Sequence, residues 1–339
     1  MKKITLQDIS NQLNISKATI SFVLNGHGDE KRVSKDTQEK IVQFARENNY
    51  KANYLARGLS LGKSETIGLV VPNIGDGYFA RIARRIERKA RRSGYNVVYS
   101  STGESKERES ELISSMLSRG VDGLIIASSL KNQEDILELK RSNFPFVLID
   151  RYYPDLEANY VGEDNEEGAS KATMQLLKTG RKRIGFVTLK SALGVLHQRM
   201  KGYQLSMEQS GLPLEDLWIR ELDYEYTESD MHIQIKSLVQ SPSSIEGIVF
   251  ATHFLAASGI RALKELHVRV PADVALVSFG QMNAFDITDP PITSIVQPVD
   301  ELGDRAVEIL LDNLNGETSD NRRVILGNRL EIRKSCGTP

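Results

Sequence analysis

The N-terminal fold is decided by two short segments, Thr5-Leu6-Gln7-Asp8-Ile9-Ser10-Asn11-Gln12-Leu13 and Ser16-Lys17-Ala18-Thr19-Ile20-Ser21-Phe22-Val23-Leu24-Asn25, which Asn14-Ile15 joins. The apolar residues of the first segment recur at the spacing of one helix face: Leu6, Ile9 and Leu13. Thr5 and Ser16 open the two segments, where a hydroxyl can accept a hydrogen bond from a free backbone N–H. We therefore expect two short helices with a tight turn between them.

The second helix of this pair has an apolar and a polar face. Ile20 and Val23 are spaced to contact the first helix, and the other side chains face outward: Lys17, Ala18, Ser21 and Phe22. Small residues at its N-terminus leave free backbone N–H groups able to approach phosphates and base edges. An ordinary helical hairpin with a solvated polar face is the alternative. The pattern favours DNA binding by a helix-turn-helix.

A third helix completes a small all-α module over residues 1–50, which show no strand pattern. Ser34 is placed to cap this helix, with Asp36 in its first turn. The residues expected on its inner face are Ile41, Val42, Phe44 and Ala45. In residues 51–63, Gly58 and Gly62 make a helical turn marginal on its own. We interpret this segment as a linker that orders conditionally.

From Thr66 onward, apolar β-rich runs alternate with helical stretches. Strands are expected at 67–71, 96–99, 123–127, 146–149, 184–188, 247–251 and 274–278. Helices are expected near 78–93, 106–119, 132–142, 166–179, 198–210, 229–239 and 254–266. This alternation predicts parallel sheets covered by helices on both faces. So many strands favour two lobes, and ligands of such folds bind at the carboxyl ends of the strands, here in the cleft between the lobes.

The composition excludes several classes of protein. Of the 339 residues 40% are hydrophobic and only one is cysteine, which excludes a disordered chain, a disulfide framework and a cysteine-rich zinc site. The sequence has no run of 18 apolar residues, and polar residues occupy the place of a signal peptide's apolar stretch. We therefore expect a soluble, cytoplasmic protein that does not contact membranes.

The net charge of −1 is an average over unlike parts of the chain. Residues 1–63 carry 11 Lys and Arg against 6 Asp and Glu, a net charge of +5, which leaves −6 for the rest. This asymmetry indicates an anion-binding N-terminal segment and a body that repels DNA. Residues 81–92 are unusually basic within that body; a solvated face is favoured there over a second DNA contact or a site for an acidic partner.

Motifs of the common α/β enzymes are missing from the sequence. Gly75-Asp76-Gly77 lacks the third glycine of a dinucleotide-binding loop, and neither a phosphate-binding P-loop nor a His-Glu-x-x-His zinc motif is present. Cys336 lies in a polar tail, and the five histidines are scattered. A secreted binding protein would share the two lobes but has no use for a helix-turn-helix. We therefore expect no enzyme, no cofactor and no metal.

Segments along the chain resemble the lactose/galactose repressor family of bacterial transcription regulators. The likeness runs through residues 4–25 and 33–59, and in the body through 67–73, 121–125, 183–186, 270–274 and 291–298. It implies an α/β protein with an N-terminal all-α helix-turn-helix headpiece (1–50) and a hinge helix (51–63). The body (64–335) would be two-lobed, like periplasmic binding proteins, with parallel sheets. Its first lobe would comprise residues 64–162 and 293–322, and its second lobe residues 163–292 and 323–335.

The resemblance implies a homodimer that binds double-stranded operator DNA. The residues it places on DNA are Thr5, Leu6, Ser16, Lys17, Ala18, Thr19, Ser21, Phe22, Asn25, Ser34, Thr37, Asn53, Ala56 and Leu59. Leu59 occupies the position of a leucine that the family inserts into the minor groove to kink the DNA. Phe22 stands where the family often has an arginine. It can contact a thymine methyl but cannot donate to guanine, and a place in the core is the equal alternative.

The resemblance also implies a small-molecule effector between the lobes. The residues expected to contact it are Tyr78, Phe79, Asp150, Arg199, Tyr224, Thr252, Gly280 and Gln281. Thr252 and Gly280 stand where many members carry groups that bind sugar hydroxyls, so we expect fewer carboxylates beside Arg199 than in those members, which suits a phosphorylated or acidic sugar. The implied function is a repressor of carbohydrate-utilisation genes under allosteric control by a sugar or sugar derivative. The motifs leave open an activator, and whether the ligand releases or recruits DNA.

Overall fold

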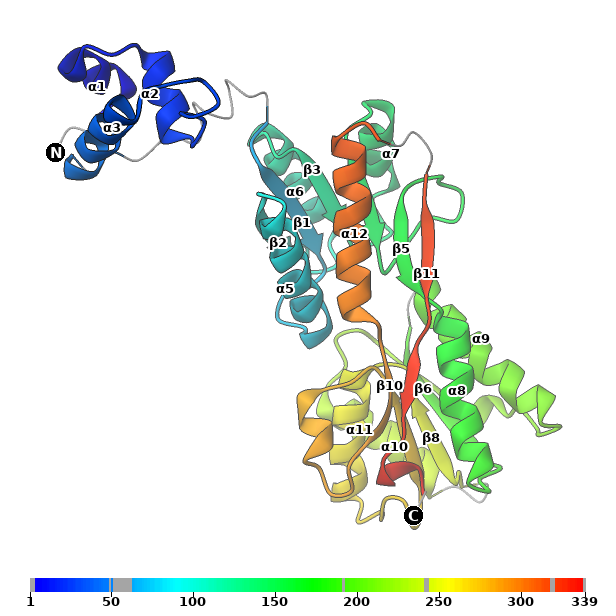
Figure 1. Ribbon diagram of the computed structural model, residues 1–339. Coiled ribbons are helices and arrows are strands. Elements are labelled where there is room, and N and C mark those ends of the chain that lie inside the picture. Colours follow the sequence, from blue (N-terminus) through cyan, green and yellow to red (C-terminus); the bar gives the residue numbers. More distant parts are fainter. Residues whose placement is uncertain are drawn as a thin grey trace. The chain divides into compact units, whose positions relative to one another are not determined.

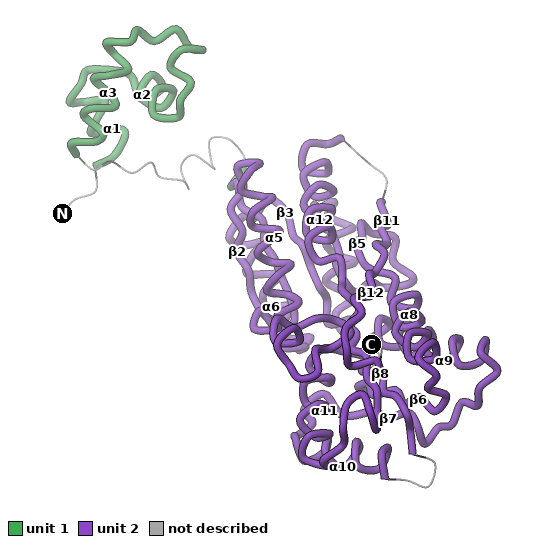
Figure 2. Tube along the Cα trace, turned by 60° about the horizontal axis from the view of Figure 1, so that its bottom comes forward, with its two compact units in different colours: residues 1–64 green, residues 65–339 purple. Residues whose placement is uncertain are grey.

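The structure, a computed structural model, describes residues 4–48, 50, 63–190, 193–240, 244–317 and 321–337. The chain divides into two compact units, residues 1–64 and 65–339 (Figures 1 and 2). Among the described residues, no helix is both long and apolar enough to cross a lipid bilayer.

The first unit contains α1 (Leu6–Leu13), α2 (Lys17–Leu24) and α3 (Lys35–Glu47), where helices were predicted. Its core is formed by Ile9, Ile20, Val23 and Ile41. The prediction that Val42 belongs to the inner face of α3 is wrong, because that side chain is 51% exposed. Successive residues of a helix are rotated by about 100°, so the position next to Ile41 turns toward solvent.

Each of these helices begins at a hydroxyl N-cap, as predicted. Thr5 Oγ1 accepts a hydrogen bond from the Asp8 backbone N–H at 3.2 Å, and the Asp8 carboxylate accepts from the Thr5 N–H at 2.8 Å. Ser16 Oγ accepts from the Thr19 N–H at 3.1 Å, and Ser34 caps α3 in the same way. Each such cap contributes about 1 kcal/mol, a useful share of the stability of so small a core.

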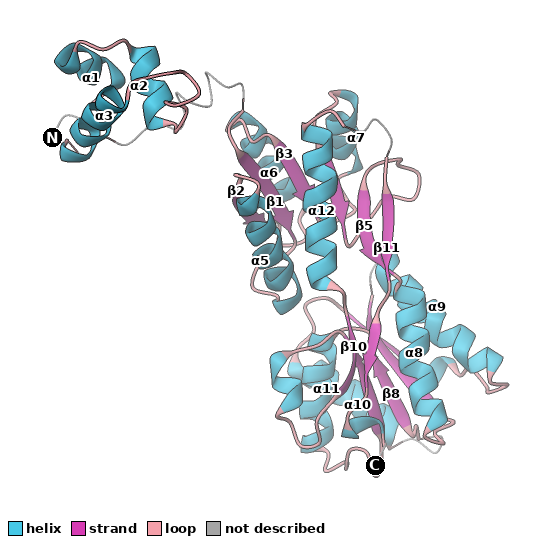
Figure 3. Cartoon of the chain, viewed as in Figure 1, coloured by secondary structure: helices cyan, strands magenta, loops and turns pink. Residues whose placement is uncertain are grey.

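The first lobe of the second unit is a six-stranded parallel sheet between two layers of helices (Figure 3). Its strands, in spatial order, are β11 (Arg323–Leu326), β5 (Tyr160–Glu163), β4 (Phe146–Ile149), β3 (Gly123–Ile126), β1 (Thr66–Val71) and β2 (Asn96–Ser101). Helices α5 (Gly77–Arg92) and α12 (Val299–Leu314) cover one face, and α6 (Lys106–Ser118) and α7 (Gln133–Arg141) cover the other. Both faces are therefore buried, which explains the continuous apolar runs of the central strands.

The second lobe repeats this plan with a second six-stranded sheet. Its strands, in spatial order, are β12 (Arg329–Glu331), β10 (Thr293–Val296), β9 (Ala275–Phe279), β8 (Gly247–Phe250), β6 (Ile184–Leu189) and β7 (Ile219–Leu222), and only β12 runs antiparallel to its neighbour. The helices are α8 (Asn165–Lys178), α9 (Gly194–Gln209), α10 (Glu228–Val239) and α11 (His253–Glu265). The sequence suggested that Cys336 lies in a polar tail. In the structure Cys336 is instead fully buried in this core.

The chain passes between the lobes after β5, after β10 and after β11. The lobe boundaries predicted at residues 293 and 323 are wrong. Thr293 of β10 pairs with Val277 of β9 in the second sheet, and Arg323 of β11 pairs with Tyr160 of β5 in the first. The crossings therefore lie a few residues later, at 297–298 and 327–328, because both strands complete a sheet before the chain leaves the lobe.

Candidate nucleic-acid interface and ligand cleft

The outward face of α2 and its two cap residues present half of the residues expected to contact DNA. Ser16, Lys17, Ala18, Phe22 and Asn25 are exposed, and Thr19 and Ser21 are half-buried. Ile20 is fully buried and Val23 nearly so, as the helical spacing predicted. The helix thus shows one face to the core and leaves its small and polar face free for a major groove.

The core alternative for Phe22 is wrong. Its ring is 36% exposed, and the ammonium of Lys31 lies 5.5 Å from the ring centroid. The loop that carries Lys31 is fixed to α3: the Asp29 carboxylate accepts hydrogen bonds from Lys35 Nζ at 2.7 Å and from Gln38 Nε2 at 2.8 Å. An outward apolar ring with a cation beside it is thereby held on the surface that α2 presents.

The remaining residues predicted to contact DNA are divided between the cap positions and the linker. Thr5 and Ser34 are exposed, and Leu6 and Thr37 are half-buried. Asn53, Ala56 and Leu59 lie outside the described residues, as do Gly58 and Gly62.

A cleft in the second unit is lined by residues of both lobes. The first lobe contributes Pro72, Asn73, Asp76, Tyr78, Phe79, Glu104, Asp150 and Arg151. The second lobe contributes Leu189, Leu193, Val195, Leu196, Arg199, Tyr224, Thr252, His253 and Phe254, and Gln297 comes from a crossing segment. These residues lie at the carboxyl ends of strands or at the starts of the following helices. Parallel sheets place ligand sites at this edge.

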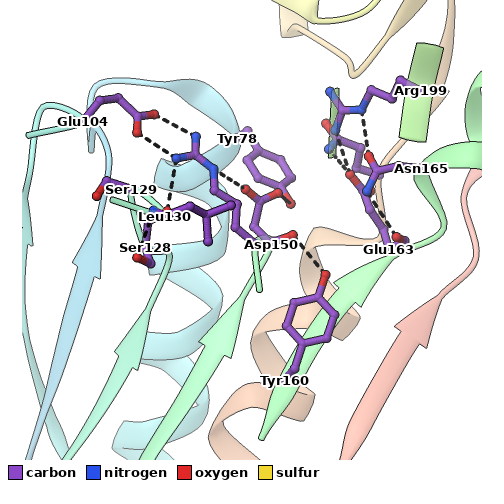
Figure 4. A network of polar contacts seen from close by, with 12 residues as sticks. Tyr78, Glu104, Ser128, Ser129, Leu130, Asp150, Tyr160, Glu163, Asn165 and Arg199 are labelled. Atoms are coloured by element: carbon purple, nitrogen blue, oxygen red, sulfur yellow. Dashed lines mark hydrogen bonds and ion pairs between the residues drawn. The ribbon is translucent and has the colours of Figure 1, made fainter. Parts of the chain in front are cut away.

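Asp150 is the centre of a buried network on the first-lobe side of the cleft (Figure 4). Its carboxylate accepts a hydrogen bond from the Tyr78 hydroxyl at 3.0 Å and lies 3.3 Å from Arg151 Nε. Arg151 also donates to both oxygens of Glu104, each at 2.7 Å. Asp150 has a φ of 63°, a left-handed conformation that is uncommon outside glycine and asparagine and often marks a functional position.

Arg199 is the centre of a second network, on the other side (Figure 4). Its guanidinium donates to Asn165 Oδ1 at 2.7 Å, to the Ala251 carbonyl at 2.8 Å and to Glu163 Oε1 at 3.1 Å. Glu163 Oε1 also accepts from Gln297 Nε2 at 2.6 Å. Burial raises the pKa of Glu163 to about 7, although the charge of Arg199 opposes that shift.

Comparison with known proteins identifies the two parts of the chain. Residues 5–53 match the family model "Bacterial regulatory proteins, lacI family", and residues 173–336 match a periplasmic binding protein-like domain. The chain is 31% identical to catabolite control protein A of Priestia megaterium over 334 residues, which cover 98% of this chain and 99% of that protein. The chain belongs to the lacI family of bacterial regulatory proteins.

Two further relatives extend this comparison. The ribose operon repressor of Haemophilus influenzae is 27% identical over 98% of each chain. The lac repressor dimer bound to operator superposes with a TM-score of 0.87 over 99% of each chain, at 24% identity, and so shares the fold. As a lacI-family member, this protein is a transcription regulator with a DNA-binding helix-turn-helix, and not an enzyme.

In this lacI-family regulator, six of the eight residues expected around an effector line the cleft: Tyr78, Phe79, Asp150, Arg199, Tyr224 and Thr252. Gly280 lies behind the wall, where an added Cβ would come within 2.9 Å of Gln297 Oε1, and its φ of 84° also favours glycine. The Gln281 carbonyl accepts from Arg81 Nη2 at 3.3 Å, a contact between the lobes. Their part in ligand binding stays a prediction.

Several polar and charged residues in the cleft wall or directly behind it were not predicted from the sequence: Asp76, Glu104, Arg151, Glu163, His253 and Gln297. Asp76 begins α5 as its N-cap and lies 3.4 Å from His253 Nε2. Burial opposes ionisation of Asp76, but hydrogen bonds and the charges of His253 and Arg81 lower its pKa below the ordinary value. A signal for Asp76 was available, since an acidic residue before a helix that follows a strand stands at the carboxyl edge of the sheet.

Carboxylates nevertheless stand around Arg199. Glu163 contacts Arg199 directly, and Asp76, Glu104 and Asp150 line the same cleft. The positions of Thr252 and Gly280 carry no information about Glu163, whose place beside Arg199 depends on where β5 ends in the folded protein.

The basic segment in α5 is partly paired within the protein. Arg85 forms an ion pair with Asp304 of α12, and Lys89 Nζ lies 2.7 Å from the Glu308 carboxylate. Arg84, Arg88, Arg91 and Arg92 are exposed. Part of the basic character therefore fixes α5 to α12.

Proposed function

We propose that this protein is a homodimeric repressor of carbohydrate-utilisation genes that acts on operator DNA in the cytoplasm. Its effector would be a sugar or sugar derivative bound between the lobes. The observation that carries this proposal is the cleft itself, in which Asp150 of the first lobe and Arg199 of the second present polar groups to one space. A ligand that contacts both lobes has different affinities for different lobe orientations, which is the requirement for allosteric control.

The shape of the cleft supports a ligand-driven movement. The cleft is partly open to solvent and has an accessible volume of about 90 Å³, which is smaller than the about 300–1,000 Å³ of usual ligand pockets. We therefore expect the lobes or the lining side chains to move when a sugar binds. Such a movement of the lobes could change the affinity of the first unit for DNA.

The relatives support the class of genes and the assembly. One is named catabolite control protein A and another ribose operon repressor, both names from carbohydrate metabolism. The lac repressor of the same fold was solved as a dimer on operator DNA. Two copies would place two helix-turn-helix units on successive half-sites, as expected for a reader of palindromic DNA.

The test begins with selection of genomic DNA fragments by the full-length protein, followed by fluorescence anisotropy on the selected operator with and without added sugars. We expect one class of sugar to change operator affinity at least tenfold, and sedimentation to show a dimer. Asp150→Asn should abolish the response to the sugar while leaving operator affinity in its absence within about twofold. Arg261→Gln, at an exposed ion pair with Glu228, is the matched control. A response that survives Asp150→Asn and also survives Tyr78→Phe would contradict the proposal.

A further inference from the structure

The cleft contains more negative than positive charge. Three carboxylates line it, those of Asp76, Glu104 and Asp150, against the two guanidinium groups of Arg151 and Arg199. A fourth carboxylate, Glu163, stands directly behind Arg199. Among the described residues that form the cleft, these groups sum to a charge of −1, or −2 with Glu163, and a protonated His253 would raise the sum by one.

The two guanidinium groups are already engaged by the protein. Arg151 donates to both oxygens of Glu104 and to the Ser128 carbonyl. Arg199 donates through all three of its nitrogens to protein oxygens, and its guanidinium lies 3.8 Å from the ring centroid of Phe279. Most of the donor capacity of both arginines is thus directed at protein oxygens, although Arg151 Nε has no hydrogen-bond partner among the described residues, so less of each planar fork is available to a phosphate or a carboxylate.

The carboxylates, in contrast, retain acceptor capacity. Glu163 Oε2 is buried with no hydrogen-bond partner in the part of the chain that the structure describes. Asp76 uses Oδ1 for both the Tyr78 N–H and His253, and no described residue donates to its Oδ2. Asp76 lines the cleft with its side chain 22% exposed, so its Oδ2 can accept a charge-assisted hydrogen bond from a positively charged donor of a ligand.

Aromatic rings complete the surroundings. Tyr78, Phe79, Tyr224 and Phe254 all line the cleft. Such rings attract cations through their faces and also pack against the apolar faces of a sugar. The same walls therefore suit both the frame of a carbohydrate and an ammonium group attached to it.

We propose that the effector of this cleft is a hydroxylated ligand that carries an ammonium group, such as an amino sugar. The inference rests on the proposed function, because it names the charge class of the effector at that site. The ammonium would contact the carboxylates of Asp76 and Asp150. Its positive charge would neutralise the negative charge of the cleft that Arg151 and Arg199 leave uncompensated.

The protonation behaviour of the carboxylates agrees with this class. The pKa of Asp76 is lowered, so it is charged at neutral pH. Burial raises the pKa of Asp150 and brings that of Glu163 to about 7. A bound cation stabilises the ionised form of both, so binding would be accompanied by release of protons to the buffer.

The experiment is calorimetric titration of the full-length protein at pH 6.5 with three matched series on the gluco, galacto and manno frames. Each series contains the 2-amino-2-deoxy sugar, the neutral hexose and the hexose 6-phosphate. We expect at least one amino sugar to bind ten times more tightly than its neutral parent, and no phosphate to bind. A neutral hexose or a phosphate that binds as tightly as its amino counterpart overturns this inference and leaves sugar control intact. Absence of binding by all three charge classes overturns the sugar-controlled function as well.

Variants locate the ammonium. Asp76→Asn keeps an N-cap for α5 but removes one charge, and it should weaken the amino sugar about tenfold while changing affinity for the neutral parent by less than about threefold. Glu111→Gln removes an exposed carboxylate at 67% exposure, outside the cleft lining, and should change neither affinity. Equal weakening of both ligands by Asp76→Asn overturns the assignment of the ammonium to this carboxylate.

Discussion

The Glu163 carboxylate and the Arg199 guanidinium are 3.1 Å apart, and this ion pair joins the first lobe to the second. Glu163 lies at the end of β5, whereas Arg199 belongs to α9. Their side chains are 0% and 8% exposed. Gln297, from another crossing segment, donates to the same carboxylate oxygen. The contact therefore couples two of the three connections between the lobes to the wall of the cleft.

Removal of one member of this buried pair should destabilise the protein strongly. Arg199→Met leaves a buried carboxylate without its cation, and we expect a loss of about 3–5 kcal/mol in the free energy of unfolding. The double variant with Glu163→Gln should recover part of that loss, which denaturant unfolding of the four proteins in the cycle would measure. Arg261→Met, at an exposed pair, should cost less than about 1 kcal/mol. Additive effects of Arg199→Met and Glu163→Gln would show that the pair is not coupled.

The stability of the body should fall as pH rises through neutrality. Burial raises the pKa of Glu163 to about 7 in the folded state, against the opposing charge of Arg199, so the folded protein holds this proton more tightly than the unfolded chain. The stabilising contribution is complete below the unfolded pKa of about 4.5 and is lost as pH rises through about 7. Glu163→Gln cannot ionise, so its stability relative to the native protein should rise between pH 5 and 8 in thermal unfolding. If the difference in stability between Glu163→Gln and the native protein stays constant from pH 5 to 8, the shifted pKa is contradicted. Glu111→Gln, at an exposed carboxylate, is the control.

Phe22 should read a thymine methyl. Phe22→Ala is expected to reduce operator affinity by about 1 kcal/mol in each half-site, the scale of one buried methyl group. Replacement of the contacted thymine by uracil, which lacks the methyl, should have the same effect on the native protein and no further effect on Phe22→Ala. Val42→Ala, at an exposed apolar residue on α3, is the control. Full additivity of the protein and base changes would assign Phe22 another role.

The first unit should carry the phosphate contacts. Operator affinity falls as salt concentration rises, and Lys17→Gln should make this dependence less steep. The negative slope of log affinity against log salt should become smaller in magnitude by about one, because one phosphate contact is lost. The double variant Arg88→Gln/Arg91→Gln removes two exposed cations of α5 and should leave both affinity and slope unchanged. Binding measured over a series of salt concentrations distinguishes these outcomes. A reduced slope in the α5 variant would support a second DNA contact instead of a solvated face.

Much of the fold follows from local periodicity. The spacing of Leu6, Ile9 and Leu13 and the hydroxyl at Ser16 predict α1 and the start of α2, because capping and one buried stripe involve only neighbouring residues. The central strands, such as β1, are equally visible, since burial on both faces demands continuous apolar runs. Outer and crossing strands are less visible. β11 is Arg-Val-Ile-Leu and β12 is Arg-Leu-Glu. Runs of four and three residues are too short to distinguish a strand from a loop until a neighbouring strand provides hydrogen bonds.

Local pattern is enough to predict a helix-turn-helix followed by two sheets of alternating strands and helices, and the family resemblance points to Asp150 and Arg199 as cleft residues. The groups that surround these two residues become visible only in the folded protein. Glu163 and Gln297 are 134 residues apart in the chain and yet share a hydrogen bond, because crossing segments from different parts of the sequence converge between the lobes. Their convergence places carboxylates around Arg199, and this reversed the charge expected of the ligand. The net charge of a cleft depends on which side chains from distant parts of the chain come together there. Local sequence pattern does not predict those contacts.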